Sequence, residues 1–174
     1  MNQKTTTIEV GINNGFEAQA YKILTTPTIP AIPRLIDGKL SWSKELVDFI
    51  ALMKIALKNK ENGIALAANQ IWSDPNAPCP RVFVLWNEDH TEIEEYINPT
   101  VKGTGKTLIL EEACLRVVAF VTRKSRAKNA TVTNQKLDSP ELMNSVKYSG
   151  LHSQAVQHEV DHLDGKTIKK INHG

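Results

Sequence analysis

The sequence predicts an α+β fold in which antiparallel β-sheets pack around a central C-terminal helix. Apolar residues recur at helical spacing near residues 44–59 and again at residues 151–163, and several short β-rich runs lie between these segments. No helix-length segment separates the middle strands, which disfavours parallel βαβ winding. At 174 residues, the chain is expected to form one domain over residues 1–174.

The first helix is predicted from Lys44 to Lys58, where apolar residues recur every three or four positions. Ser43 suits its N-cap, and Gly63 lies beyond its end. Prolines at 27–33 indicate an extended surface arm, and those at 74–80 indicate a loop. Strands are then expected at residues 81–86, 94–97, 107–110, 117–122 and 130–133, with Asn98 and Pro99 closing the second of them.

The second helix is predicted from Leu151 to Leu163, after Gly150 and before Gly165, a residue that suits a C-terminal cap. It carries the sharpest pattern of the chain, His158-Glu159-Val160-Asp161-His162. Residues four apart lie one above the other on a helix, so the two imidazoles can share one ion. Glu159 stands where it can take a proton from water activated by that ion. The pattern favours a metal site over a surface helix with stray histidines.

A catalytic ion needs a third protein ligand and an open position for water. The long zincin signature places a third histidine downstream, but Ile168 occupies that position here. The third ligand is therefore expected upstream, and the candidates are Cys114, Cys79, His90, His152 and the carboxylates. Cys114 is favoured because it directly follows an apolar strand, whereas Cys79 stands between two prolines.

Composition excludes several classes of protein. Hydrophobic residues make up 41% and charged residues 23%, as in a globular protein, which argues against a disordered chain. A net charge of +2 gives no broad field for nucleic acid or an anionic membrane, so neither is expected as a partner. The basic cluster at 122–128 is expected to be a solvated loop. Two cysteines and the lack of a membrane span or secretory signal indicate a cytoplasmic protein.

Three blocks of the sequence resemble the peptide deformylase family. They read GIALAANQ at 63–70, EACL at 112–115 and QHEVDHLDG at 157–165, and they occur in the family's order. The resemblance covers roughly residues 21–168 and is to a short, divergent form of the kind that viruses also encode. It implies a metal-dependent hydrolase that removes the N-formyl group from the N-terminal formylmethionine of newly made polypeptides and releases formate.

The resemblance also implies a role for individual residues. One divalent ion would be held by Cys114, His158 and His162, with Fe²⁺ as the ion in the cell and Zn²⁺, Ni²⁺ or Co²⁺ able to replace it in purified protein. Glu159 would be the general base. The Gln70 side-chain amide and the Leu115 backbone N–H would stabilise the oxyanion that forms on the formyl group.

Substrate contacts are expected on two segments. The resemblance implies that the backbone of Gly63, Ile64 and Ala65 binds the substrate peptide as an added strand. Leu151 and Ala155 precede His158 by seven and three residues on the same side of the helix, so with Ile64 and Leu110 they are expected to form an apolar pocket for methionine. The alternative, that these are ordinary core residues, is about equally compatible with the pattern.

Other residues are expected to support or alter this site. Asp161 and Gln157 are expected to orient the histidines or the Cys114 loop by hydrogen bonds, and Glu112 is expected to form an ion pair with Arg126. The chain departs from the family pattern at Ala65, Ala113, Arg116 and Gln154, the first two standing in place of glycine.

The resemblance implies N-formylated nascent peptides as partners, together with a transient contact with the ribosome. The chain stops at Gly174, before the long C-terminal helix by which many bacterial members dock there. Two other functions compete with deformylation. A zincin-like endopeptidase could use the same helix, and a non-catalytic, metal-stabilised module could bind nascent peptides without hydrolysing them.

Overall fold

Antiparallel strands wrap around one helix in this computed structural model, which describes residues 22–114 and 117–166 and, among these, the side chains outside 111–122. The elements in order are β1 (Arg34–Ile36), β2 (Lys39–Ser41), α2 (Lys44–Lys58), β3 (Ala65–Ala67), η1 (Ala68–Gln70), β4 (Val82–Trp86), β5 (Ile93–Cys114), β6 (Val117–Gln135), β7 (Asn144–Ser149) and α3 (Gly150–Leu163). One sheet has the order β3-β4-β5-β6-β7, with every pair antiparallel, and β1 pairs with β2 separately. The predicted α+β class is confirmed.

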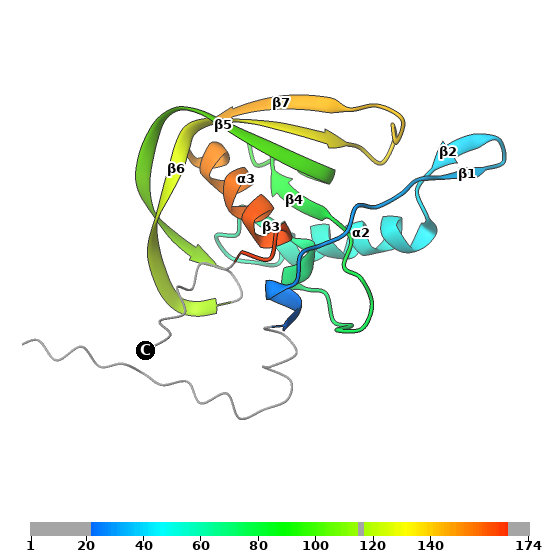
Figure 1. Ribbon diagram of the computed structural model, residues 1–174, viewed down its shortest axis with the longest axis horizontal. Helices are drawn as coiled ribbons and strands as arrows, with labels where there is room; N and C mark the ends of the chain where they lie inside the picture. Colours follow the sequence, from blue (N-terminus) through cyan, green and yellow to red (C-terminus); the bar gives the residue numbers. More distant parts are fainter. Residues whose placement is uncertain (1–21, 115–116, 167–174) are drawn as a thin grey trace, which may run out of the picture.

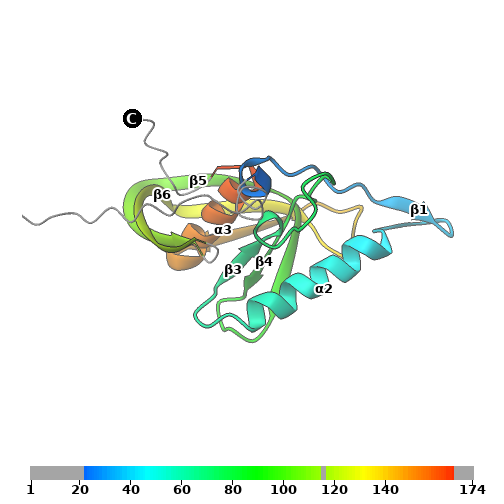
Figure 2. The ribbon, with the colours of Figure 1, turned by 90° about the horizontal axis from the view of Figure 1, so that it is seen from below.

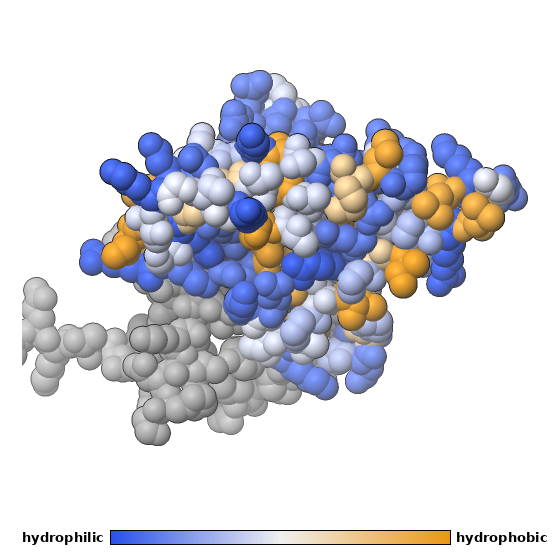
Figure 3. Space-filling view, turned by 45° about the horizontal axis from the view of Figure 1, so that its top comes forward, coloured by the Kyte–Doolittle hydropathy of each residue, from blue (hydrophilic) through white to orange (hydrophobic). Residues whose placement is uncertain are grey.

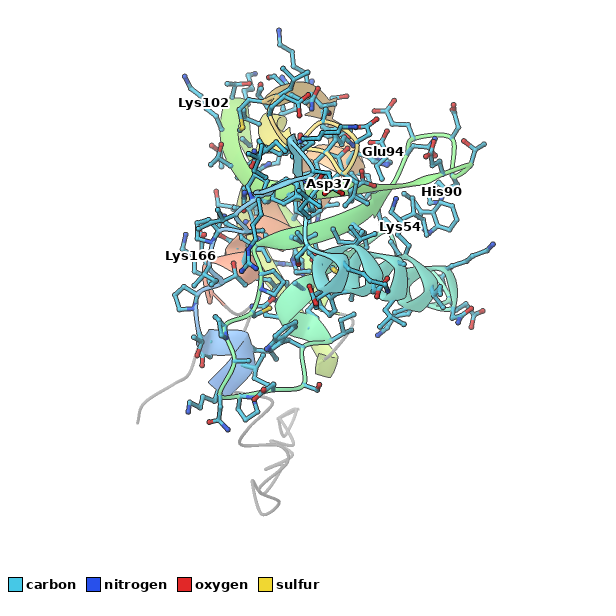
Figure 4. The ribbon with its side chains drawn as sticks, turned by 90° about the vertical axis from the view of Figure 1, so that its right-hand side faces the viewer. Asp37, Lys54, His90, Glu94, Lys102 and Lys166 are labelled. Atoms are coloured by element: carbon cyan, nitrogen blue, oxygen red, sulfur yellow. The ribbon has the colours of Figure 1, made fainter. Side chains whose placement is uncertain are left out.

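Helix α3 lies within the curve of strands β5 and β6 (Figure 1). Helices α2 and α3 both pack against β3 and β4, and Figure 2 shows them on opposite sides of these two strands. Helix α2 begins as predicted, because the Ser43 hydroxyl accepts a hydrogen bond from the Leu46 N–H at 3.3 Å. Lys54 extends from α2 toward β5 (Figure 4) and pairs with Glu95 at 2.5 Å. Among the described residues, no helix has both the length and the apolar character needed to cross a membrane.

The central strands form one long hairpin, whereas the sequence predicted several short strands. Strand β5 continues through Asn98 and Pro99 because these residues make a bulge: Asn98 has φ 52°, and the register with β6 shifts between Ile97 and Thr100. The Asn98 side chain then bonds both backbone groups of Ala31, at 2.7 and 2.8 Å. Residues that usually end a strand therefore bend this one and fasten the N-terminal arm to it.

The basic cluster at 122–128 lies within strand β6, so the prediction of a solvated loop is wrong. Arg126 is only 5% exposed, and its Nη1 lies 2.6 Å from the Asp161 carboxylate on α3. Lys124 donates to the same carboxylate oxygen at 2.7 Å. Asp161 follows Arg126 by 35 residues and Lys124 by 37 residues in the chain. The local sequence therefore does not reveal these ion pairs.

Strands β1, β2, β3 and β7 were not predicted. The β1–β2 hairpin turns at Asp37 and Gly38, both with positive φ (50° and 78°), as an Asp-Gly turn of type I′ requires. The hairpin projects from the body of the molecule and exposes 73% of Leu35. Hydrophobic residues accordingly gather at that end of the surface (Figure 3).

Candidate metal centre

The C-terminal end of α3 is closed by the predicted glycine cap. The Gly165 N–H donates to the His162 carbonyl at 2.9 Å, and the Lys166 N–H donates to the Asp161 carbonyl at 2.8 Å. These two bonds, with Gly165 at φ 72°, form a Schellman motif. The Asn69 side chain, from η1, also donates to the His162 carbonyl at 2.5 Å. The last turn of α3, which carries His162, is therefore fixed both by its own cap and by a neighbouring element.

Replacing Gly165 by alanine should destabilise the protein by about 1–3 kcal/mol, because an L-residue disfavours this positive φ. A Cβ at this position would also lie 2.5 Å from the Thr25 carbonyl oxygen. Urea unfolding of the metal-free protein would measure the change. Gly38→Ala is a matched control: its φ is 78°, but a Cβ there would meet nothing within 4 Å. Equal losses in the two variants would contradict the contact with Thr25.

His158 and His162 turn their imidazoles toward one point. Their Nε2 atoms lie 3.0 Å apart, and the two side chains belong to residues that are only 8% and 2% exposed. Two nitrogens bound at about 2.0–2.1 Å to one tetrahedral ion would be about 3.3 Å apart. Two neutral imidazole lone pairs facing each other need a proton or a cation between them. The described donor set therefore fits a divalent metal ion.

Glu159 lies between these two histidines in the sequence and is 4% exposed. Carboxylates are rarely buried to this extent unless they are paired or functional. The helix that aligns the two imidazoles thus also carries a carboxylate into the protein interior beside His158.

Gln70 is held by the turn that follows β3. Its Oε1 accepts a hydrogen bond from the Ala67 N–H at 2.7 Å, and the residue is 4% exposed. A backbone N–H can bond only the oxygen of the amide, so this contact fixes which way the side chain faces. The NH₂ group of Gln70 is therefore the end of the amide that does not face the Ala67 N–H. Because α3 packs against both β3 and η1, this donor belongs to the same region as the histidines.

The predicted third ligand stands where β5 ends. Cys114 is the last residue of that strand, and its backbone pairs with Val117 of β6. The Cys114 side chain lies outside the described part of the chain, as do Leu115 and Arg116 entirely and the side chains of Glu112 and Ala113. The expected roles of these residues therefore stay predictions.

The other candidates for third ligand do not join the two histidines. No group of three His, Cys, Asp or Glu side chains suited to a metal occurs within residues 22–110 and 123–166. His152 bonds the Trp86 carbonyl at 2.9 Å, and exposed His90 stacks on Trp86. In Figure 4, His90 lies on the opposite side of the molecule from Lys166, which closely follows α3. Cys79 is buried in its loop, and burial raises the pKa of its thiol to about 12.

Gln157 and Asp161 bind strand β6. The Gln157 amide pairs with the backbone of Ala127, and Asp161 pairs with Arg126 and Lys124. Burial raises the pKa of the Asp161 carboxyl, but the hydrogen bonds from the two cations outweigh burial and lower this pKa overall. The described hydrogen bonds of these two side chains thus do not reach the histidines, and the Cys114 loop that they were also expected to orient lies outside the described side chains. The described ion pair of Arg126 is with Asp161.

The residues expected to bind the substrate lie at β3, on β5 and on α3. Ala65 pairs with Leu85, so β3 is the outermost strand of the described five-stranded sheet, the position that strand addition requires. Leu151 is 55% exposed, which is not the exposure of a core residue, while Ala155 and Leu110 are half-buried. Gly63 is buried and Ile64 is half-buried, just before β3.

Sequence reasoning missed four residues that hold the site together, namely Asn69, Ser153, Lys124 and Thr28. The Thr28 hydroxyl donates to the Leu163 carbonyl at 2.9 Å and so fastens the N-terminal arm to the end of α3. Only Ser153 had a usable signal, because it precedes Gln157 and Asp161 by four and eight residues on one helix face.

Converging imidazoles and a buried carboxylate on one helix, within an antiparallel α+β fold, define the class of metalloproteins with a His-Glu-x-x-His helix. The family model described as polypeptide deformylase matches residues 23–173. The chain belongs to the polypeptide deformylase family.

Individual relatives agree with this assignment. A peptide deformylase from Teredinibacter turnerae is 34% identical over 105 residues, which cover 60% of this chain and 59% of that protein. The chain thus spans about three fifths of the length of that curated relative. Among solved structures, a class I type b peptide deformylase from Acinetobacter baumannii has a TM-score of 0.69 at 24% identity, covering 84% of this chain and 90% of the other. A probable peptide deformylase from Synechococcus phage S-SSM7 has a TM-score of 0.67 at 26% identity, covering 84% and 91%.

Proposed function

We propose that this protein is a peptide deformylase, a metal-dependent hydrolase that removes the formyl group from N-terminal formylmethionine and releases formate. The observation that carries the proposal is the convergence of the His158 and His162 Nε2 atoms, 3.0 Å apart, beside buried Glu159. Family membership gives this arrangement its reaction. The proposed catalytic domain spans residues 1–174, and the proposed compartment is the cytoplasm, where formylated peptides are made.

Cys114 completes the proposed ligand set with His158 and His162. Its thiolate and the two imidazoles suit Fe²⁺, Zn²⁺, Ni²⁺ or Co²⁺, and Fe²⁺ is the ion proposed in the cell. When bound, the ion supplies Lewis acidity and lowers the pKa of water at the site. The position of Cys114 at the end of β5 supports this proposal, because β5 packs against α3.

The remaining catalytic roles belong to groups of the protein itself. Glu159 accepts the proton of the attacking water and delivers it to the leaving amine nitrogen. The Gln70 NH₂ group, with its oxygen already held by Ala67, donates to the formyl oxygen as negative charge develops there. The Leu115 backbone N–H is the proposed second donor. Burial of Glu159 and Gln70 keeps bulk water from competing with these contacts.

The substrate peptide is proposed to lie along β3 as an added strand, contacting the backbone of Gly63, Ile64 and Ala65. The methionine side chain would then rest against Leu110, Leu151 and Ala155. The position of β3 as the outermost strand of the described sheet and the 55% exposure of Leu151 support this placement. N-formylated nascent peptides are the proposed substrates, and a transient contact with the ribosome would bring the enzyme to them.

The test is formate release from formyl-Met-Ala by protein loaded anaerobically with Fe²⁺, Ni²⁺ or Co²⁺. Elemental analysis of the same sample establishes that metal is bound, and chelated protein is the control. Turnover that depends on the metal supports the proposal. Bound metal without release of formate from any formylated peptide would contradict it and favour a peptide-binding module.

A further inference from the structure

We infer that Gln157 is a positioning residue, whose side-chain amide substitutes for a missing β-strand and thereby sets the placement of the two histidine ligands. The inference rests on the proposed metal site but concerns a contact distant from the ion. Gln157 would affect metal binding through its contact with strand β6 and not by touching the ion.

Strand β7, one of the two neighbours of β6 in the sheet, ends at the point where α3 begins. Strand β7 pairs with β6 up to the pair Ser149 and Asn129. The chain then leaves the sheet at Gly150, with φ 57°, and continues as α3. Beyond Asn129, this edge of β6 has no described strand beside it, and α3 packs against β6 instead. The backbone groups of Ala127 on this edge need partners from the helix.

Gln157 supplies those partners. Its Oε1 accepts from the Ala127 N–H at 3.0 Å, and its Nε2 donates to the Ala127 carbonyl at 2.9 Å. A paired residue of an adjacent antiparallel strand would make the same two bonds. The Nε2 group also donates to the Ser153 carbonyl at 2.9 Å, which holds the amide against its own helix.

Two further residues extend this contact along the helix. Ser153 lies one turn before Gln157, and its hydroxyl donates to the Ala127 carbonyl at 3.1 Å. Asp161 lies one turn after it and pairs with Arg126 at 2.6 Å. Residues at i, i+4 and i+8 share one helix face, so α3 meets β6 through a polar stripe made of Ser153, Gln157 and Asp161.

Strand β5 is shaped to admit this contact. A Cβ on Gly103 would lie 2.6 Å from the Ala127 Cβ and 3.5 Å from Gln157 Oε1. The first distance is too short for two carbon atoms, so a side chain at 103 would push β6 and the Gln157 amide away. Gly103 thus leaves room for the junction of β5, β6 and α3.

The stripe fixes the rotation of α3 about its axis. His158 directly follows Gln157, and His162 directly follows Asp161. Each residue advances about 100° around the helix, so a helix clamped at 157 and 161 presents 158 and 162 in one direction. A helix free to turn would hold its imidazoles less well toward a ligand that comes from β5.

The test is the affinity for Co²⁺, measured by anaerobic titration of the metal-free full chain through the visible absorbance of the bound ion. Gln157→Glu keeps the size of the side chain but cannot donate to the Ala127 carbonyl. We expect the Kd for Co²⁺ to rise about 10–100-fold, as for residues that orient metal ligands, and the absorption spectrum to change. Formate release need not be measured.

Gln135→Glu is the matched control. Gln135 is also half-buried, accepts from Asn98 Nδ2 at 2.7 Å and donates to the Pro140 carbonyl at 2.5 Å, and its described bonds do not involve α3. It should lose stability but bind Co²⁺ like the wild type. If Gln157→Glu does not fold, Ser153→Ala removes one bond of the same stripe and should weaken binding in the same direction by less.

The possible failures are distinguishable. Wild-type affinity and spectrum in a folded Gln157 or Ser153 variant would overturn this inference while leaving the proposed function intact. Equal weakening in Gln135→Glu would also overturn it, because general stability would then explain the loss. A wild-type protein that binds no Co²⁺ would overturn the proposed function and this inference together.

Discussion

Glu159→Ala should nearly abolish formate release while the metal stays bound. In α3, which the structure describes throughout, Glu159 is the only buried carboxylate next to His158 or His162. A positioned general base contributes about 10²–10⁴-fold to rate. We therefore expect kcat to fall by about 10³-fold or more. Both imidazoles remain, so the metal content should not change. Formate release from formyl-Met-Ala and elemental analysis of the same preparation measure the two effects.

Two variants separate proton transfer from packing. Glu159→Gln keeps the volume of the side chain but replaces a carboxylate oxygen by an NH₂ group, which cannot act as a base, so it should lose as much activity as the alanine variant. Glu92→Ala removes an exposed carboxylate and should leave turnover unchanged. Activity of Glu159→Gln within tenfold of the wild type would remove Glu159 from the role of general base.

The helices were predictable from sequence because their information is local. Apolar spacing, the Ser43 cap and the Gly165 cap all act within a few residues, and the structure has them where expected. Strands β5 and β6 were not predictable in the same way. Asn98 and Pro99 usually end a strand, and only pairing with a distant strand turns them into a bulge.

The residues of the site were likewise predictable where the information is local and not where it depends on distant contacts. The spacing of His158 and His162 revealed that they could converge, because a helix fixes the geometry between residues four apart. The partner of Arg126 was not visible, since Asp161 comes to it through the packing of α3 on β6. The contact of Gln157 was less predictable, because its partner is the backbone of Ala127 and residue types do not indicate which backbone groups a side chain will bond.

Cys114→Ser should lose the metal. A serine hydroxyl is neutral at physiological pH and is a poor ligand for a borderline ion, whereas a thiolate is a strong one. Outer residues that only orient ligands already cost about 10–100-fold in affinity when replaced, so loss of a direct ligand should cost more than about 100-fold. Elemental analysis after gel filtration and Co²⁺ titration measure the loss.

Cys79→Ser is the matched control, because Cys79 is buried away from the histidines and burial raises the pKa of its thiol to about 12. It should keep full metal content.

The same pKa makes Cys79 unreactive at pH 8, so a disulfide reagent added to the folded metal-free protein should modify one thiol, and bound metal should protect it. A Cys114→Ser protein that retains stoichiometric metal would show that the third ligand lies elsewhere. A zincin-like site would then become the better description, since deformylase chemistry is proposed here on a thiolate ligand that joins the end of β5 to the two histidines of α3.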